Sequence, residues 1–162
     1  MSKKLVDYLK QDGVITVFDV DGVLAPYEYG DLKHCVSDEE WLNGFSDPDN
    51  NLYSKMRGLP FLHDFINNKN IDDVYVCSQA DDYESVAKIK FITNNYNIKR
   101  ENIYLVRDKS MKVDVLNEIR DMRDIPENKI AIIEDTVKTL DTIAKGHDYM
   151  TVHISSFFDF EE

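Results

Sequence analysis

The order of apolar and polar residues along the chain changes repeatedly between two patterns. Short runs rich in β-branched and other apolar residues occur at 14–24, 74–77, 103–106, 130–133 and 150–154. The segments between most of these runs carry apolar residues three or four positions apart, which is typical of amphipathic helices. Because strands and helices alternate in this way, the chain is predicted to have an α/β fold with a doubly wound, mostly parallel sheet.

Several helix starts are marked by characteristic residues. Ser37 with Glu40, and Asp81 with Glu84, have the three-residue spacing of a capping box. Pro60 precedes an apolar stripe and is suited to the first turn of a helix. Helices are therefore expected to begin after Ser37, at Pro60 and after Asp81.

Residues 25–60 interrupt the alternation after the first strand. A chain of 162 residues is long enough for one core and too short for two ordinary domains. Residues 1–162 are therefore predicted to form a single domain, with residues 25–60 as a small insertion. The insertion mixes acidic residues with the aromatic residues Tyr27, Tyr29, Trp41, Phe45 and Tyr53.

Composition and charge exclude several classes of protein. The chain is 43% apolar and 31% charged, without an apolar stretch long enough for a membrane span or an apolar signal segment near its start. Its two cysteines, Cys35 and Cys77, are expected to be reduced thiols. We therefore expect a cytoplasmic protein that does not bind membranes. The net charge of -12 would repel phosphate backbones, so a nucleic-acid partner is not expected, and no feature indicates an oligomeric state.

Polar residues follow four of the predicted strands. In a doubly wound sheet the carboxyl ends of the strands meet at one crevice, so these residues are expected to lie together. Carboxylates are ligands that Mg²⁺ prefers, while a hydroxyl and a lysine can bind phosphate oxygens. The set therefore predicts a site for phosphoryl transfer. Its members are Asp19 and Asp21 after the first strand, Ser78 after the second, Lys109 or Lys112 after the third, and Glu134 and Asp135 after the fourth.

The same residues carry a resemblance to a known family. The chain contains Phe-Asp-Val-Asp-Gly-Val at 18–23, Val-Cys-Ser at 76–78, a lysine pair at 109 and 112, and Ile-Glu-Asp at 133–135. In this order the motifs resemble those of the haloacid dehalogenase superfamily, on its phosphatase side. The resemblance implies a Rossmann-like core in which residues 25–60 form a small, cap-like insertion.

The resemblance also implies a role for each position. Asp19 would be the nucleophile that forms an aspartyl-phosphate, and Asp21 would protonate the leaving oxygen and then activate water. Mg²⁺ would be bound by a carboxylate oxygen of Asp19, the backbone carbonyl of Asp21, Asp135 and water. Glu134 would either bind the metal through water or orient its neighbours, and Ser78 would bind the transferring phosphoryl group.

The family uses one phosphate-binding lysine here, and two positions are available. Lys109 directly follows the third strand, which favours it for this role. Lys112 has Leu116 one helical turn later, a spacing that resembles other branches of the superfamily. We prefer Lys109, and Lys112 is then expected to be solvated.

Together these expectations predict an enzyme, a Mg²⁺-dependent phosphatase. It would hydrolyse a small phosphomonoester, such as a nucleotide or a similar metabolite, through an aspartyl-phosphate on Asp19. Two alternatives stay open: a polynucleotide end phosphatase, which would need a basic patch beside the crevice, and a non-catalytic binding protein on the same fold. The intact pair of Asp19 and Asp21, together with an acidic fourth motif, argues against the binding protein.

Overall fold

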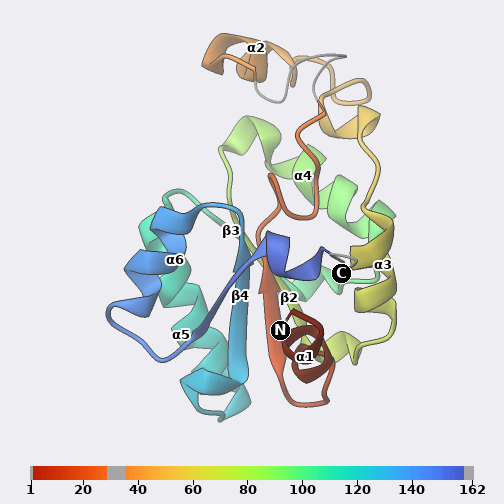
Figure 1. Cartoon of the computed structure of the whole chain (residues 1–162). Coiled ribbons are helices and arrows are strands. Elements are labelled where there is room, and N and C mark those ends of the chain that lie inside the picture. Colours follow the sequence, from red (N-terminus) through yellow and green to blue (C-terminus); the bar gives the residue numbers. More distant parts are fainter. Residues whose placement is uncertain (1, 29–35, 159–162) are drawn as a thin grey trace.

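Five parallel strands form the centre of the molecule (Figure 1). The computed structural model describes residues 2–28 and 36–158, and Tyr29 and Cys35 lie outside these ranges. The strand order is β3-β2-β1-β4-β5, which confirms the predicted α/β fold. The strands are β1 Ile15–Phe18, β2 Val74–Gln79, β3 Ile103–Val106, β4 Ile130–Glu134 and β5 Met150–His153.

Helices cover both faces of this sheet. Figure 1 shows α1, α3 and α4 on one side of the strands and α5 and α6 on the other. The sheet is therefore doubly wound, as the alternating pattern predicted. The helices are α1 Ser2–Leu9, α2 Asp38–Asn43, α3 Pro60–Asn67, α4 Asp82–Asn95, α5 Lys112–Arg123 and α6 Val137–Ala144.

The surroundings of β1 explain why its sequence does not alternate between apolar and charged residues. Every residue of β1 is buried, and successive side chains point to opposite faces. Phe18 packs in the core beneath α1, α3 and α4, whereas Ile15 and Val17 pack in the core beneath α5 and α6. A strand with apolar neighbours on both faces is built mainly from apolar residues, and the one polar residue of β1, Thr16, directs its hydroxyl to the Asp73 carbonyl at 3.4 Å.

The predicted helix starts are confirmed. The side chain of Ser37 accepts a hydrogen bond from the backbone N–H of Glu40 in a full capping box at the start of α2. Asp81 and Glu84 form the same arrangement at the start of α4. Pro60 lies in the first turn of α3, where its missing N–H costs no hydrogen bond.

Residues 36–58 of the insertion join the core through aromatic side chains. The Trp41 and Tyr53 rings have centroids 5.9 Å apart, and the Tyr53 ring lies 5.7 Å from that of Phe91 on α4. In Figure 1, α2 lies at the top of the molecule above α4. The segment therefore contributes side chains next to the carboxyl edge of the sheet, and its role as a cap stays a prediction.

Two expectations from composition concern membranes and thiols. None of the helices among residues 2–28 and 36–158 is long and apolar enough to cross a membrane. Cys77 is a free, fully buried cysteine, and burial raises the pKa of its thiol to about 12. The thiol is therefore a packing group rather than a nucleophile.

The strand order also determines where a site can form. The chain passes from β1 outward through β2 and β3, and then returns to place β4 on the other side of β1. The backbone N–H of Asp19 donates to the carbonyl of Ile133 at 2.9 Å, which holds the ends of β1 and β4 level. A crevice opens where the strand order reverses in this way.

Candidate active site

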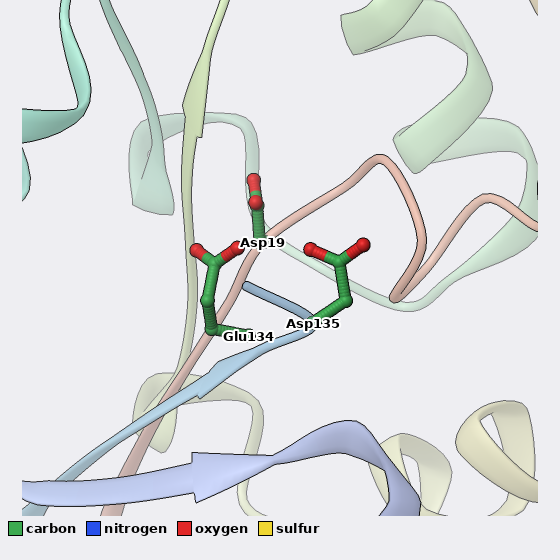
Figure 2. A group of neighbouring side chains, drawn as sticks. All are labelled: Asp19, Glu134 and Asp135. Atoms are coloured by element: carbon green, nitrogen blue, oxygen red, sulfur yellow. The ribbon is translucent and has the colours of Figure 1, made fainter. Parts of the chain in front are cut away.

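Three carboxylates meet at the point where the strand order reverses. Asp19 follows β1, Glu134 is the last residue of β4, and Asp135 comes next. One carboxylate oxygen from each residue lies within 4.8 Å of the others, and Figure 2 shows the three groups gathered at the strand ends. Hard oxygen donors on adjacent strands, two of them buried, fit a small divalent cation.

A buried lysine joins two of these carboxylates. The Lys112 ammonium lies 3.0 Å from Asp19 Oδ2 and 2.5 Å from Glu134 Oε2. The Lys112 side chain has no solvent exposure, so the expectation that it is solvated is wrong. The reason is helical phase: Leu116, one turn later on α5, is also fully buried, and residues four apart share a helix face.

Lys109 lies farther from the carboxylates, in the 3₁₀ turn Lys109–Met111. It is exposed, and its ammonium donates to Thr136 Oγ1 at 3.3 Å. Lys109 lines the cavity in front of the site, whereas Lys112 contacts Asp19 directly. The structure therefore favours Lys112 as the lysine that acts with Asp19.

The pKa of Asp19 is lowered and that of Glu134 is raised, although burial disfavours the ionised form of both. Burial disfavours the ionised form of Asp19, but the charge of Lys112 and a hydrogen bond from Ser78 outweigh it and lower its pKa. Burial and the negative charge of Asp19 raise the pKa of Glu134 to about 7. The Lys112 charge therefore favours ionisation of Asp19 over ionisation of Glu134.

Ser78 and Asp21 lie on either side of Asp19. Ser78, near the end of β2, is 1% exposed, and its hydroxyl is hydrogen-bonded to Asp19. The Asp21 side chain, 24% exposed, reaches the cavity. The backbone N–H of Gly22 donates to the carbonyl of Ala25 at 2.9 Å, which keeps this turn tight.

The structure adds residues that the motifs did not identify. Lys88 on α4 lies 2.9 Å from Asp21 Oδ2, and the Tyr53 hydroxyl donates to Asp21 Oδ1 at 2.6 Å. A signal for Lys88 was present in the spacing, because Glu84, Lys88, Phe91 and Ile92 form the buried face of α4. Tyr53 has no comparable signal, since only tertiary folding brings the insertion to Asp21.

A cavity of about 550 Å³ opens in front of these groups. Its volume lies in the range of small-molecule binding sites. Lys109 is the only cationic side chain among the described residues that line it. The acidic residues of the lining are Asp19, Asp21, Asp38, Asp81, Glu84 and Asp135, and its other residues are Tyr27, Trp41, Leu42, Ser78, Gln79 and Tyr83.

Glycine is required at position 22 for two reasons: its backbone conformation and the atoms that lie close to it. Its φ is +77°, and a Cβ there would lie 2.2 Å from Asp135 Oδ2. Gly22→Ala should therefore displace Asp135 and weaken metal binding at least tenfold, measured by isothermal titration with Mg²⁺, besides a backbone cost of about 1–3 kcal/mol.

Gly13 provides the matched control for this prediction. It has a φ of +78°, but no atom lies within 4 Å of the Cβ that alanine would add. Gly13→Ala should lower stability by a similar amount and leave Mg²⁺ affinity unchanged. Equal Mg²⁺ affinities in the two variants would show that the close approach of Gly22 to Asp135 does not matter.

The fold thus brings the seven predicted residues to one edge of the sheet, where Lys112 contacts Asp19 directly and Lys109 reaches Glu134 and Asp135 through Thr136. Comparisons of the chain with models of protein families, with curated proteins and with solved structures found no match. The activity of this protein must therefore be inferred from the side chains that meet where β1 and β4 end.

Proposed function

We propose that the protein is a Mg²⁺-dependent phosphohydrolase of the haloacid dehalogenase type, which cleaves a small phosphomonoester through an aspartyl-phosphate on Asp19. One observation carries the proposal: Asp19 is buried 3.0 Å from the Lys112 ammonium, which lowers the pKa of its carboxyl group, and a second carboxylate, Asp21, lines the same cavity. A nucleophile and a separate proton donor are what phosphomonoester cleavage by covalent catalysis requires.

In the first step an Asp19 carboxylate oxygen attacks phosphorus, and the bond from phosphorus to the ester oxygen breaks. Asp21 gives a proton to that oxygen, and the alcohol leaves. In the second step water attacks the phosphoryl group, Asp21 takes a proton from the water, and inorganic phosphate leaves Asp19. Lys112 and Ser78, which contact Asp19, would stabilise the charge on the phosphoryl oxygens.

The carboxylates also fit a metal ion. Asp19 and Asp135 would bind Mg²⁺ directly, because Glu134 Oε2 is already paired with Lys112 and its Oε1 accepts from the Thr136 backbone N–H at 3.3 Å. The bound ion would neutralise charge on the phosphoryl group as it transfers. Without a bound cation, the acidic lining of the cavity would repel a phosphate dianion.

The cavity supports a small substrate. Aromatic side chains from the insertion and α4, among them Trp41 and Tyr83, form one wall and could contact a base or another flat group. A nucleoside monophosphate or a similar metabolite would fit. A polynucleotide end is disfavoured, because the basic patch that it would need is missing from the described lining, where Lys109 is the single cation.

Release of inorganic phosphate tests this function. The protein should hydrolyse p-nitrophenyl phosphate and at least one member of a panel of nucleoside monophosphates and sugar phosphates in Mg²⁺, and should lose that activity in excess EDTA. A folded protein that cleaves none of them, and no phosphorylated oligonucleotide either, would point to a binding protein. Cleavage of the oligonucleotide alone would establish the polynucleotide alternative.

Metal binding can be measured without turnover. Mg²⁺ at about one hundred times its Kd should stabilise the protein by about 2.7 kcal/mol, seen as a rise in Tm. Asp135→Asn should reduce this rise severalfold, because it removes a ligand. Asp141→Asn, which changes an exposed aspartate on α6, should keep it. An undiminished rise in Asp135→Asn would mean that the ion binds elsewhere.

A further inference from the structure

Lys88 is a fully buried lysine that the reaction described above does not use. It lies on α4 with no exposed side-chain surface. Its ammonium donates to Asp21 Oδ2 at 2.9 Å, to the carbonyl of Gln79 at 2.5 Å and to Ser78 Oγ at 3.5 Å. Glu84 Oε1 lies 3.7 Å away. An ammonium has three N–H donors, and each has an oxygen within reach here.

These contacts are directional. The Gln79 carbonyl comes from the end of β2 and Glu84 from one turn earlier on the same helix, so rigid elements hold the ammonium on two sides. Asp21, by contrast, lies on the loop after β1. A buried charge in such a setting fixes its partner, because separating the two leaves each without a counter-charge.

The other oxygen of Asp21 is held from a different part of the chain. Tyr53, in the insertion, is 2% exposed and donates its hydroxyl to Asp21 Oδ1 at 2.6 Å. The Tyr53 ring packs against Trp41 and Phe91, at centroid distances of 5.9 and 5.7 Å. The insertion and α4 thus fix the two oxygens of one carboxylate separately.

The same network reaches the wall of the cavity. Glu84, which lies 3.7 Å from Lys88, accepts a hydrogen bond from the Trp41 indole N–H at 2.7 Å. Trp41 and Glu84 both line the cavity, as Asp21 does. The side chains that would contact the leaving group are therefore connected through Lys88 to the carboxylate that would protonate it.

We propose that Lys88 and Tyr53 are positioning residues, which hold the Asp21 carboxyl group where it transfers a proton to the leaving oxygen. The proposal rests on the proposed phosphohydrolase function. Lysine can only donate hydrogen bonds, so Asp21 Oδ2 stays an acceptor, whereas a tyrosine hydroxyl can donate or accept. The Lys88 ammonium and the Tyr53 hydroxyl therefore hold the carboxylate that forms when Asp21 gives its proton to the ester oxygen, as the bond from that oxygen to phosphorus breaks.

This role predicts a dependence on the leaving group. An alkoxide needs a proton as it leaves, whereas p-nitrophenolate is stable without one. The ratio kcat/KM covers only the steps up to the first irreversible one, here transfer to Asp19, so it isolates this proton transfer. Lys88→Met should lower kcat/KM about a hundredfold or more for an alkyl phosphate that the wild type cleaves, and by less than about tenfold for p-nitrophenyl phosphate.

A second variant and a control keep the test decisive. Tyr53→Phe keeps the ring packing and removes one hydroxyl, so it should show the same selective loss to a smaller extent even if Lys88→Met folds poorly. Lys90→Met, on the same helix but exposed, should leave both substrates unaffected. The mutant Asp21→Asn sets the size of the effect when proton donation is lost.

The outcomes separate this proposal from the function on which it rests. Equal losses for alkyl and aryl phosphates in Tyr53→Phe, or no loss in either variant, would overturn the positioning role while Mg²⁺-dependent hydrolysis by the wild type still stands. Absence of hydrolysis in the wild type would instead overturn the function, and the positioning role with it.

Discussion

Asp19→Asn should abolish Mg²⁺-dependent hydrolysis, lowering kcat by about a thousandfold or more. Asparagine has the same shape but lacks the anionic oxygen that would attack phosphorus, so no aspartyl-phosphate can form. The variant should still fold, because Lys112 retains its contact with Glu134 at 2.5 Å. The measurement is phosphate release from p-nitrophenyl phosphate, with the circular dichroism spectrum and Tm as checks of folding.

The exposed aspartate Asp141 serves as the control for this prediction. Asp141→Asn makes the same chemical change on α6, outside the cavity lining, and should keep wild-type kcat. If Asp19→Asn folds and retains more than a few per cent of the wild-type rate, Asp19 is not the nucleophile.

Lys112→Met should cause the largest combined loss of stability and activity. Asp19, at 8% side-chain exposure, would lose its counter-charge, and the fully buried Glu134 would lose the same partner. Breaking a buried ion pair from one side costs about 3–5 kcal/mol. We expect a loss of that size in the free energy of unfolding by urea at neutral pH, together with a loss of hydrolysis.

Lys109 supplies the comparison. It is exposed and donates a hydrogen bond to Thr136 Oγ1, so Lys109→Met should change stability by no more than about 0.5 kcal/mol. Adding Glu134→Gln to Lys112→Met should recover part of the lost stability, because a neutral amide replaces a buried carboxyl group that has lost its cation. Equal effects of the two lysine variants would contradict the assignment of Lys112.

Much of the fold is predictable because local and tertiary preferences agree along this chain. The apolar run of β1 is buried on both faces, and helices start where Ser37, Pro60 and Asp81 predict. The alternation of strands and helices then leaves few topologies. A parallel sheet in turn brings the ends of β1, β2 and β4 to one edge, so Asp19, Ser78 and Glu134 could be grouped without coordinates.

The choice between the two lysines depended on the residue at which α5 begins. Lys109 and Lys112 are three residues apart at the start of α5, and a shift in where the helix begins decides which of them faces Asp19. The order of residues favoured Lys109, whereas the buried Leu116 shows that the inward face passes through Lys112. Helix boundaries are the least certain part of a sequence-based prediction.

The contacts of Asp21 depend on tertiary structure. Lys88 and Tyr53 come from α4 and from the insertion, far from Asp21 in the chain. A charged residue within an amphipathic helix is ordinarily solvated. Glu84 and Lys88 could be recognised as buried only because they lie on the same face of α4 as Phe91 and Ile92. Sequence reasoning therefore identified the carboxylates that are proposed to react, but not the residues that contact Asp21.

The proposed reaction requires that the phosphoryl group is carried on Asp19. Borohydride reduces an aspartyl-phosphate to homoserine, and peptide mass mapping locates the change. We expect this conversion at Asp19 when the protein turns over a phosphomonoester in Mg²⁺. No conversion is expected when EDTA is present or substrate is left out. Reduction at a different carboxylate, or none at all while phosphate is being released, would contradict the proposed reaction.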